Sequence, residues 1–241
     1  MTGYHARVRR VPFLSAVLTL ASAAAVVSQT PAPPAGLPPG PVYLVTYLEV
    51  TPAAESRTAA VLQRYRQATR REAGSLRVEA LQGLHRRSHF ALVEAWRDQD
   101  AVDAHRGAAH TAALRSAIER DGHAPPDERV LRSTVAGPIA EGVVPRAAVF
   151  VLTHADALPP ASRGTEVLLP LAEASRREAG NVRFEVLVQA ARLNHFTLVE
   201  VWRDRQAFDA HAVAPHTRDF RTKFLRVTGA LYDERLYTSL R

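Results

Sequence analysis

Four histidines have the side chains best suited to proton chemistry, and they form two pairs. His105 and His110 are five residues apart in a segment expected to be helical, and His211 and His216 repeat this spacing. Imidazole titrates near neutral pH, so one histidine of each pair could accept a proton in a pocket; helix capping or interface packing is the alternative. Five residues turn an ideal helix by about 140°, which separates the two rings. Pro215 is also expected to break the helix between the second pair, and Gly107 to loosen it between the first, so we expect no metal site.

Charged side chains on two neighbouring segments form a second candidate cluster. A hairpin with a four-residue turn at 85–88 places Glu79 opposite Glu94, and Arg77 opposite Trp96, all on one face. Two facing carboxylates beside an arginine could hold a raised carboxyl pKa, which suits a base. The alternative is a structural ion-pair cluster with tryptophan in the core, and a one-residue slip in register would dissolve the cluster. The equivalent residues later in the chain are Arg183, Glu185, Glu200 and Trp202.

Sequence motifs for nucleotides, flavins and metals are missing from the chain. We find no glycine-rich phosphate loop, no nucleophile elbow and no HExxH motif. The chain has no cysteine, which excludes disulfides and thiolate metal ligands. We therefore expect no cofactor and no bound metal.

The net charge of +7 raises the question of nucleic-acid binding. Lys223 is the only lysine, and the basic residues form neither a block nor a stripe interleaved with aromatic residues. We therefore expect no nucleic-acid partner.

The chain repeats itself at an offset of 106 positions. The run HFALVEAWRD at 89–98 corresponds to HFTLVEVWRD at 195–204, and residues 71–115 align without a gap on 177–221. A period of this length matches one small domain rather than a solenoid unit. Two joined copies of one domain predict a homodimer fused into a single chain.

Each copy shows the same order of expected elements. Pro52 suits the first position of the first helix, with Thr51 as its cap, and Gly74 and Gly180 are expected to end the first helix of each copy. Asp98 and Asp204 are natural caps for the second helix. In the first copy we expect strands at 42–50, 76–84, 89–97 and 129–135, a helix at 53–72 and another from about 98. This βαββαβ order, repeated over 147–240, predicts an α+β fold of two ferredoxin-like domains.

Both faces of the strand at 195–203 are largely apolar. Phe196, Leu198 and Trp202 lie on one face, while Val199 and Val201 lie on the other. The helices of a ferredoxin-like domain cover one face of its sheet. The other face is therefore expected to pack on the sheet of the second copy.

Three motifs together resemble the antibiotic biosynthesis monooxygenase domain. They are REAGxxRxE, then HFxLVExWRD, then AxDAHxxxxH, and the second copy closes with the same pattern at 207–220. The resemblance implies a dimeric α+β barrel, here made within one chain. It also implies oxidation of a small aromatic substrate by dioxygen without metal or flavin. Several relatives have an asparagine in the first strand where this chain reads TYL or THA, and this difference argues against haem cleavage.

The resemblance also assigns residues to a site. Its candidate catalytic residues are His211, His105, Trp202 and Trp96. Beyond the resemblance, we name as candidate substrate-binding residues Glu200, Glu94, Arg183, Arg77, Phe196, Phe220, His216 and His110. The leading hypothesis is an exported, cofactor-independent monooxygenase of a quinol or phenol. A non-catalytic module that binds a small ligand is the alternative, and a third hypothesis leaves only one copy active, because the copies differ at Gly107 and Val213.

The N-terminus has the pattern of a secretory signal. Basic residues at 7–10 precede an apolar run at 11–27, so we expect a signal peptide over 1–28 and export, with an uncleaved anchor as the alternative. No stable membrane span is expected after processing. We divide the remainder into a proline-rich linker at 29–41, domain 1 at 42–136, a linker at 137–146 and domain 2 at 147–241. Further association of these intrachain pseudo-dimers stays open.

Overall fold

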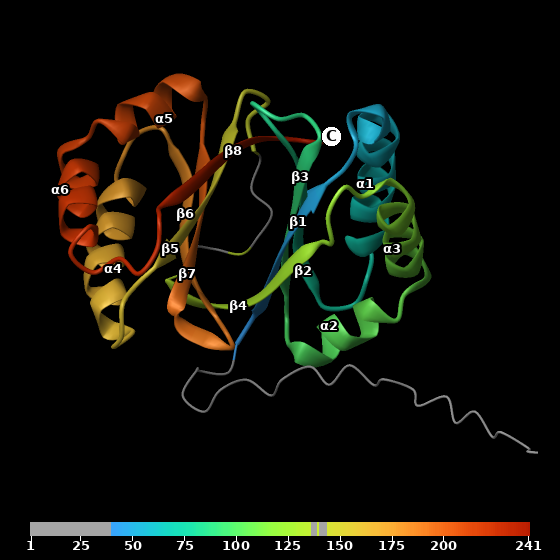
Figure 1. Cartoon of the computed structure of the whole chain (residues 1–241), viewed down its shortest axis with the longest axis horizontal. Coiled ribbons are helices and arrows are strands. Elements are labelled where there is room, and N and C mark those ends of the chain that lie inside the picture. The colour runs from blue at the N-terminus through green and yellow to red at the C-terminus, as the bar shows by residue number, and fades with distance from the viewer. Residues whose placement is uncertain (1–39, 136–138, 140–143) are drawn as a thin grey trace, which may run out of the picture. The chain divides into compact units, whose positions relative to one another are not determined.

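The computed structural model describes residues 40–135, 139 and 144–241 (Figure 1). The first copy contains β1 (Val42–Glu49), a 3-10 turn η1 (Pro52–Ala54), α1 (Glu55–Thr69), β2 (Ser75–Gly83), β3 (His89–Trp96), α2 (Gln99–Arg106), α3 (Ala109–Asp121) and β4 (Asp127–Val135). The second contains β5 (Val149–Asp156), α4 (Ser162–Arg176), β6 (Asn181–Gln189), β7 (Arg192–Trp202), α5 (Arg205–Ala212), α6 (Pro215–Phe224) and β8 (Asp233–Ser239). The predicted βαββαβ order therefore occurs twice, with the second helix of each copy divided in two. The predicted signal peptide and most of both predicted linkers lie outside the described residues.

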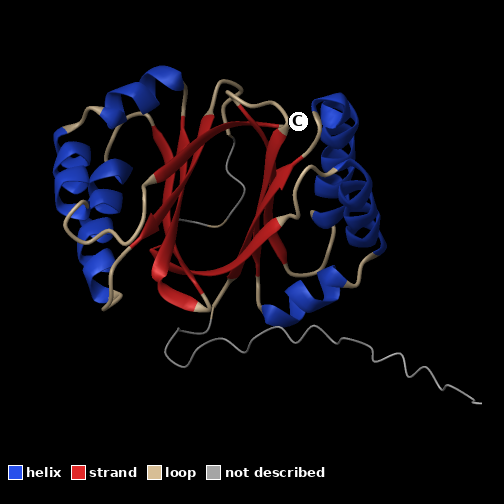
Figure 2. Ribbon diagram, in the orientation of Figure 1, coloured by secondary structure: helices blue, strands red, loops and turns tan. Residues whose placement is uncertain are grey.

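All eight strands close into one antiparallel barrel, in the order β1-β3-β2-β8-β5-β7-β6-β4 (Figure 2). Each copy contributes four neighbouring strands. The copies join at two seams, because β2 pairs with β8 and β4 pairs with β6. Closure pairs the strands at both edges of each four-stranded sheet, so neither sheet keeps a free edge. The predicted intrachain barrel of two ferredoxin-like halves is confirmed.

The two faces of β7 lie in different cores. Val199 and Val201 belong to an apolar cluster inside the barrel, together with Tyr43 and Tyr237. Phe196, Leu198 and Trp202 belong to a cluster between the barrel wall and α4–α6. The expectation that both strand faces are covered is therefore confirmed.

Two of the three helix caps expected from the sequence are confirmed. Asp98 and Asp204 cap α2 and α5, since their carboxylates accept hydrogen bonds from Ala101 N and Ala207 N, each at 2.8 Å. The side chain of Thr51 makes no capping hydrogen bond, because a 3-10 turn comes between it and α1.

The first helix also ends before the position that was expected. Helix α1 ends at Thr69, so Gly74 lies beyond it rather than at its end. Gly74 has a φ of +90°, and a Cβ there would lie 2.6 Å from the Cβ of Ala101. Glycine is therefore required at position 74 by the turn into β2 and by the close approach of α2.

The predicted hairpin register is wrong by one residue. Glu94 lies opposite Val78 rather than Glu79, and Arg77 lies opposite Ala95, with a register shift between Ser75 and Arg77. Side chains alternate between the faces of a strand, so this slip moves Arg77 and Glu79 away from Glu94. In the second copy, likewise, Glu200 pairs with Phe184, and Arg183 pairs with Val201. The predicted cluster of two glutamates, an arginine and a tryptophan therefore does not form in either copy.

Candidate functional site

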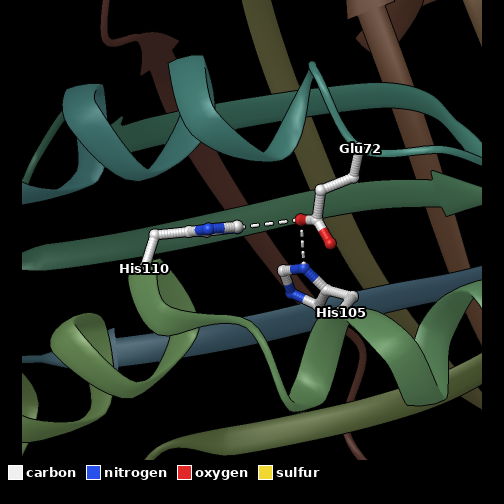
Figure 3. Close-up of side chains that lie close together, drawn as sticks. All are labelled: Glu72, His105 and His110. Atoms are coloured by element: carbon white, nitrogen blue, oxygen red, sulfur yellow. Dashed lines mark hydrogen bonds and ion pairs between the residues drawn. The ribbon is translucent and has the colours of Figure 1, made fainter.

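One carboxylate holds both histidines of the first copy (Figure 3). Glu72 Oε1 lies 2.6 Å from His105 Nδ1 and 2.8 Å from His110 Nε2. The helix is interrupted at Gly107, between α2 and α3, and the change in helix direction there brings the His110 ring back toward the His105 ring. The helix is interrupted between the histidines of each pair, as expected from Gly107 and Pro215, but the expectation that the two rings point apart is wrong.

Glu72, His105 and His110 are also close enough together to hold a metal ion. Their potential ligand atoms all lie within 4.8 Å of one another, and Glu178, His211 and His216 repeat the arrangement. Ligands around a tetrahedral zinc ion are roughly 3.3 Å apart, since each bond is about 2.0–2.1 Å. The separations of 2.6 and 2.8 Å from the carboxylate oxygen are shorter, and they are hydrogen-bond lengths. The described geometry is therefore that of two imidazoles hydrogen-bonded to one carboxylate.

The hydrogen bond to Glu72 also determines which nitrogen of His105 is the base. A carboxylate accepts, so Nδ1 carries the proton and Nε2 keeps its lone pair. Burial lowers the pKa of His105, while the hydrogen bond and the charge of Glu72 oppose the shift. His105 is therefore neutral at pH 7, with Nε2 as its proton acceptor.

Tyr65, which was not among the predicted site residues, covers that acceptor in the first copy. Its hydroxyl donates to Glu94 Oε1 at 2.8 Å, and the same oxygen lies 2.8 Å from His105 Nε2. Burial raises the pKa of Glu94 to about 7, and the Trp96 ring lies 4.5 Å from the His105 ring. The helical apolar stripe of the first helix includes Tyr65, but the stripe indicates only that this side chain is buried. Its contact with His105 depends on how α1 packs against α2.

The second copy rebuilds the histidine cluster. Glu178 Oε1 lies 2.6 Å from His211 Nδ1 and 2.8 Å from His216 Nε2. The Trp202 ring stacks on His211 at 4.3 Å and 26°, and its Nε1–H donates to Glu200 Oε2 at 2.9 Å. Burial raises the pKa of Glu200 to about 8, so this carboxyl is mainly protonated at neutral pH. Burial also lowers the pKa of His211, which leaves a neutral imidazole.

The two copies differ at the acceptor nitrogen. Leu171 in α4 stands at the position of Tyr65, and in the part of the chain that the structure describes no tyrosine hydroxyl is hydrogen-bonded to His211. Within the described ranges, the polar contacts of His211 Nε2 are Thr217 Oγ1 at 3.5 Å and Glu200 Oε2 at 3.8 Å. Both contacts are long for hydrogen bonds to nitrogen. His211 Nε2 in the second copy therefore has weaker polar contacts than His105 Nε2 in the first, and it is the more available proton acceptor.

The structure places the other predicted site residues as follows. Phe196 and Phe220 are buried in the core beneath α4–α6, where Phe220 stacks on Phe224. Arg77 and Arg183 do not join the histidine clusters. Arg77 donates to Glu185 at 3.1 and 2.7 Å, and Arg183 donates to Glu79 at 2.8 and 2.6 Å. These ion pairs run between the copies and are buried, so both arginines link the two halves of the barrel.

Two copies of one fold share a closed barrel, and each carries a Glu–His–His cluster under its helices; these features define a dimeric α+β barrel protein. The sequence matches the model of the antibiotic biosynthesis monooxygenase family over residues 41–117 and 163–223. The match spans more than half of the chain and reaches into both copies. The chain belongs to this family, and its membership supports a monooxygenase-like function in general terms.

Solved structures share the same two-copy architecture. A candidate monooxygenase from Fusobacterium nucleatum superposes with a TM-score of 0.74 at 17% identity, over 84% of this chain and 94% of the other. A candidate monooxygenase from Lactobacillus acidophilus gives 0.67 at 14% identity, over 84% and 95%. An anthrone oxidase-like protein gives 0.63 at 12% identity, over 85% and 92%. At these identities the likeness concerns the fold.

Two further findings are negative. A search of curated proteins finds no relative of this chain. Among the described residues, no helix combines the length and apolar character needed to cross a bilayer.

Proposed function

We propose that this protein is an exported, cofactor-independent monooxygenase that oxidises a quinol or a related phenol with dioxygen. The observation that carries the proposal is the Glu178–His211 pair, in which a carboxylate orients a neutral imidazole whose Nε2 makes only long polar contacts and so keeps its lone pair for a substrate hydroxyl. Trp202 stacks on this imidazole and Glu200 lies beside it, so the base stands in a dry environment.

The chemistry starts with proton transfer. His211 Nε2 takes the proton of a substrate hydroxyl, and Glu178 stabilises the imidazolium that forms. The resulting anion can donate an electron to dioxygen, which the neutral phenol does much less readily. For a hydroquinone the overall reaction needs no added reductant. One oxygen atom enters the ring to give a hydroxyquinone and the other leaves as water, while the substrate loses the four electrons that dioxygen gains.

His216 supports the same carboxylate from the solvent side. Its Nε2–H donates to Glu178 Oε1 at 2.8 Å, and its side chain is 28% exposed, against 5% for His211. This second hydrogen bond holds Glu178 in the orientation that binds His211 Nδ1–H. The two histidines therefore have different roles: His211 is the base, and His216 positions the carboxylate.

In this proposal the first copy completes the barrel and the second carries out the reaction. The Tyr65 hydroxyl lies against His105 Nε2 and donates to Glu94, so a substrate hydroxyl would have to displace a buried, hydrogen-bonded phenol there. Leu171 imposes no such competition in the second copy. Because Trp202, Glu200 and His211 are nearly fully buried, substrate entry requires α5 and α6 to move away from the barrel wall.

The test is oxygen uptake with a panel of dihydroxyarenes, comparing His211→Ala with its matched control His105→Ala. We expect His211→Ala to lower kcat by about 10²–10⁴-fold, the usual contribution of a general base. We expect His105→Ala to stay within about threefold. Equal losses in both variants would reject the assignment to one copy. Absence of uptake above that of His211→Ala for every substrate would reject the enzymatic proposal.

A non-catalytic module that binds a small ligand is the second candidate. The observation in its favour is the close packing of the site, where the Trp202 side chain has no exposed surface. A ligand that raises the melting temperature without oxygen uptake would select this candidate.

The export component of the proposal is supported by the basic and apolar pattern at 7–27. Fractionation of cells that express the full chain tests it. An unprocessed protein found only in the cytoplasm would reject export.

A further inference from the structure

The barrel has a cavity at the end where β1 finishes, apart from both histidine clusters. Its volume is about 590 Å³, which lies within the range of small-molecule sites. Strands β1 and β8 and the β2–β3 turn line it, so both copies contribute. Ile139 and Val144, from the connection between β4 and β5, pack on the interior core instead, near the strand ends opposite this mouth.

Tyr47 and His154 lie at equivalent positions of the two copies, and their rings meet at this end of the barrel. Tyr47 pairs with Asp127 of β4, and His154 pairs with Asp233 of β8. The ring centroids are 5.1 Å apart in an edge-to-face arrangement. The barrel mouth thus has an aromatic floor made by one residue from each copy.

Two arginines converge on this floor. The guanidinium groups of Arg129 and Arg235 lie 5.5 and 5.0 Å from the centre of the Tyr47 ring. Each is paired with an aspartate, Asp127 or Asp233, whose side chain is 52% or 42% exposed. Ion pairs with such exposed partners contribute little to stability, so a ligand carboxylate can replace either aspartate.

The hydrogen bonds of His154 determine its tautomer. Arg129 Nη1 lies 2.7 Å from His154 Nδ1, and a guanidinium can only donate, so Nδ1 is the acceptor and Nε2 carries the proton. Burial and the two arginines lower the pKa of His154 to about 4, which keeps the ring neutral. His154 therefore presents an N–H donor rather than a base.

Two polar atoms of the floor lack partners. Tyr47 Oη and His154 Nε2 are buried and make no hydrogen bond to any part of the chain that the structure describes. Both side chains are more than nine-tenths buried, and Tyr47 lines the cavity directly. Buried donors without an acceptor are costly, so this floor favours a ligand that brings an acceptor oxygen.

We propose that the barrel mouth binds a small aromatic carboxylate, with its carboxylate on Arg235 and the Tyr47 hydroxyl and its ring against the apolar rim. Ala124 and Pro125, together with the Tyr237 ring, supply that rim. A single negative charge is required, because Glu49, Asp127 and Asp233 also line the cavity and repel a dianion. The site is independent of the proposed oxidation, since it shares no residue with the Glu178–His211 pair.

Titration calorimetry on the full chain tests the proposal, with benzoate as the probe. Benzamide keeps the size and shape of benzoate but loses its charge, and inorganic phosphate carries charge without the ring. We expect benzoate to bind at least about tenfold more tightly than either. Arg235→Gln is expected to weaken benzoate about tenfold or more, while Arg177→Gln, on the exposed surface, leaves binding unchanged.

Tyr47→Phe removes only the hydroxyl and keeps the ring, so it tests the site even if Arg235→Gln fails to fold. We expect a loss of roughly three- to tenfold in affinity for benzoate. His211→Ala must leave benzoate affinity unchanged, which separates this site from the proposed catalytic one. The proposal is overturned if benzoate does not bind at millimolar concentration, if benzamide binds equally well, or if Tyr47→Phe has no effect.

Discussion

Removal of the Arg77 guanidinium should strongly destabilise the barrel. Arg77 makes two hydrogen bonds to Glu185 of the other copy, at 3.1 and 2.7 Å. The two side chains are only 1% and 0% exposed. Arg77→Met leaves the Glu185 carboxylate buried with Arg183 Nε, 3.4 Å away, as its closest cation. We expect Arg77→Met to remove one of the two buried ion pairs that join the copies across the barrel interior.

The magnitude follows from the cost of an uncompensated buried charge. Breaking a buried ion pair by removing one partner costs about 3–5 kcal/mol, and the remaining Arg183 contact favours the lower end. At roughly 2–4 °C per kcal/mol for a chain of this size, a loss of about 3 kcal/mol lowers the melting temperature by about 6–12 °C. Urea denaturation followed by circular dichroism measures the free energy, and a thermal scan measures the midpoint.

Two further variants make the test specific. Arg177→Met is the matched control, because its pair with Glu173 is 68% and 74% exposed and should cost less than about 0.5 kcal/mol. Glu185→Gln added to Arg77→Met removes the stranded charge, and we expect it to restore at least about 1 kcal/mol. A cost below about 1 kcal/mol for Arg77→Met, or a double variant weaker than the single one, would refute the reasoning.

Three other predictions concern single positions. Burial raises the pKa of Glu200 to about 8, against an ordinary value of 4.5. Between these two pH values the folded state keeps a proton that the unfolded state loses, so the free energy of unfolding falls as the pH rises from about 4.5 to about 8. Denaturation of Glu200→Gln at pH 5 and pH 8 should therefore show a gain over wild type that is larger at pH 8 by about 1 kcal/mol or more, and an equal gain at both pH values would contradict the assignment. Leu171→Tyr places a phenol where the first copy has one, so oxygen uptake should fall at least about tenfold while Leu171→Phe retains more activity; equal rates would exclude a role for the hydroxyl. Gly74→Ala should lower the free energy of unfolding by about 1 kcal/mol or more, because its φ is +90° and its new Cβ would meet Ala101, and an unchanged urea midpoint would contradict this.

The fold could be predicted because its signals are local or repeated. Alternation along 195–203 indicates two buried strand faces, and Asp98 and Asp204 mark helix starts through hydrogen bonds within a few residues. The repeat doubles the evidence for each element. Two copies with the same uncovered sheet face then predict that the faces meet.

The candidate site could be predicted by residue type but not by arrangement. His105, His211, Trp96 and Trp202 were named from the sequence, and in the structure each histidine ring contacts its tryptophan ring, stacked in the second copy and tilted in the first. The carboxylates that orient these histidines, Glu72 and Glu178, belong to the repeated motif but were not assigned to the site. The helix break places His110 and His216 on those carboxylates, and a continuous helix would have kept them apart.

The sequence by itself determined the duplicated βαββαβ order, the two buried faces of each strand and the residues able to transfer protons. Only the tertiary structure decided the strand register, the seams between the copies and the neighbours of each charged side chain. The reason is the two-residue period of a strand: a shift of one position exchanges its faces, and local propensities barely distinguish the two registers. That exchange directs Arg77 into the barrel and leaves Glu94 with Tyr65 and His105 beneath the helices.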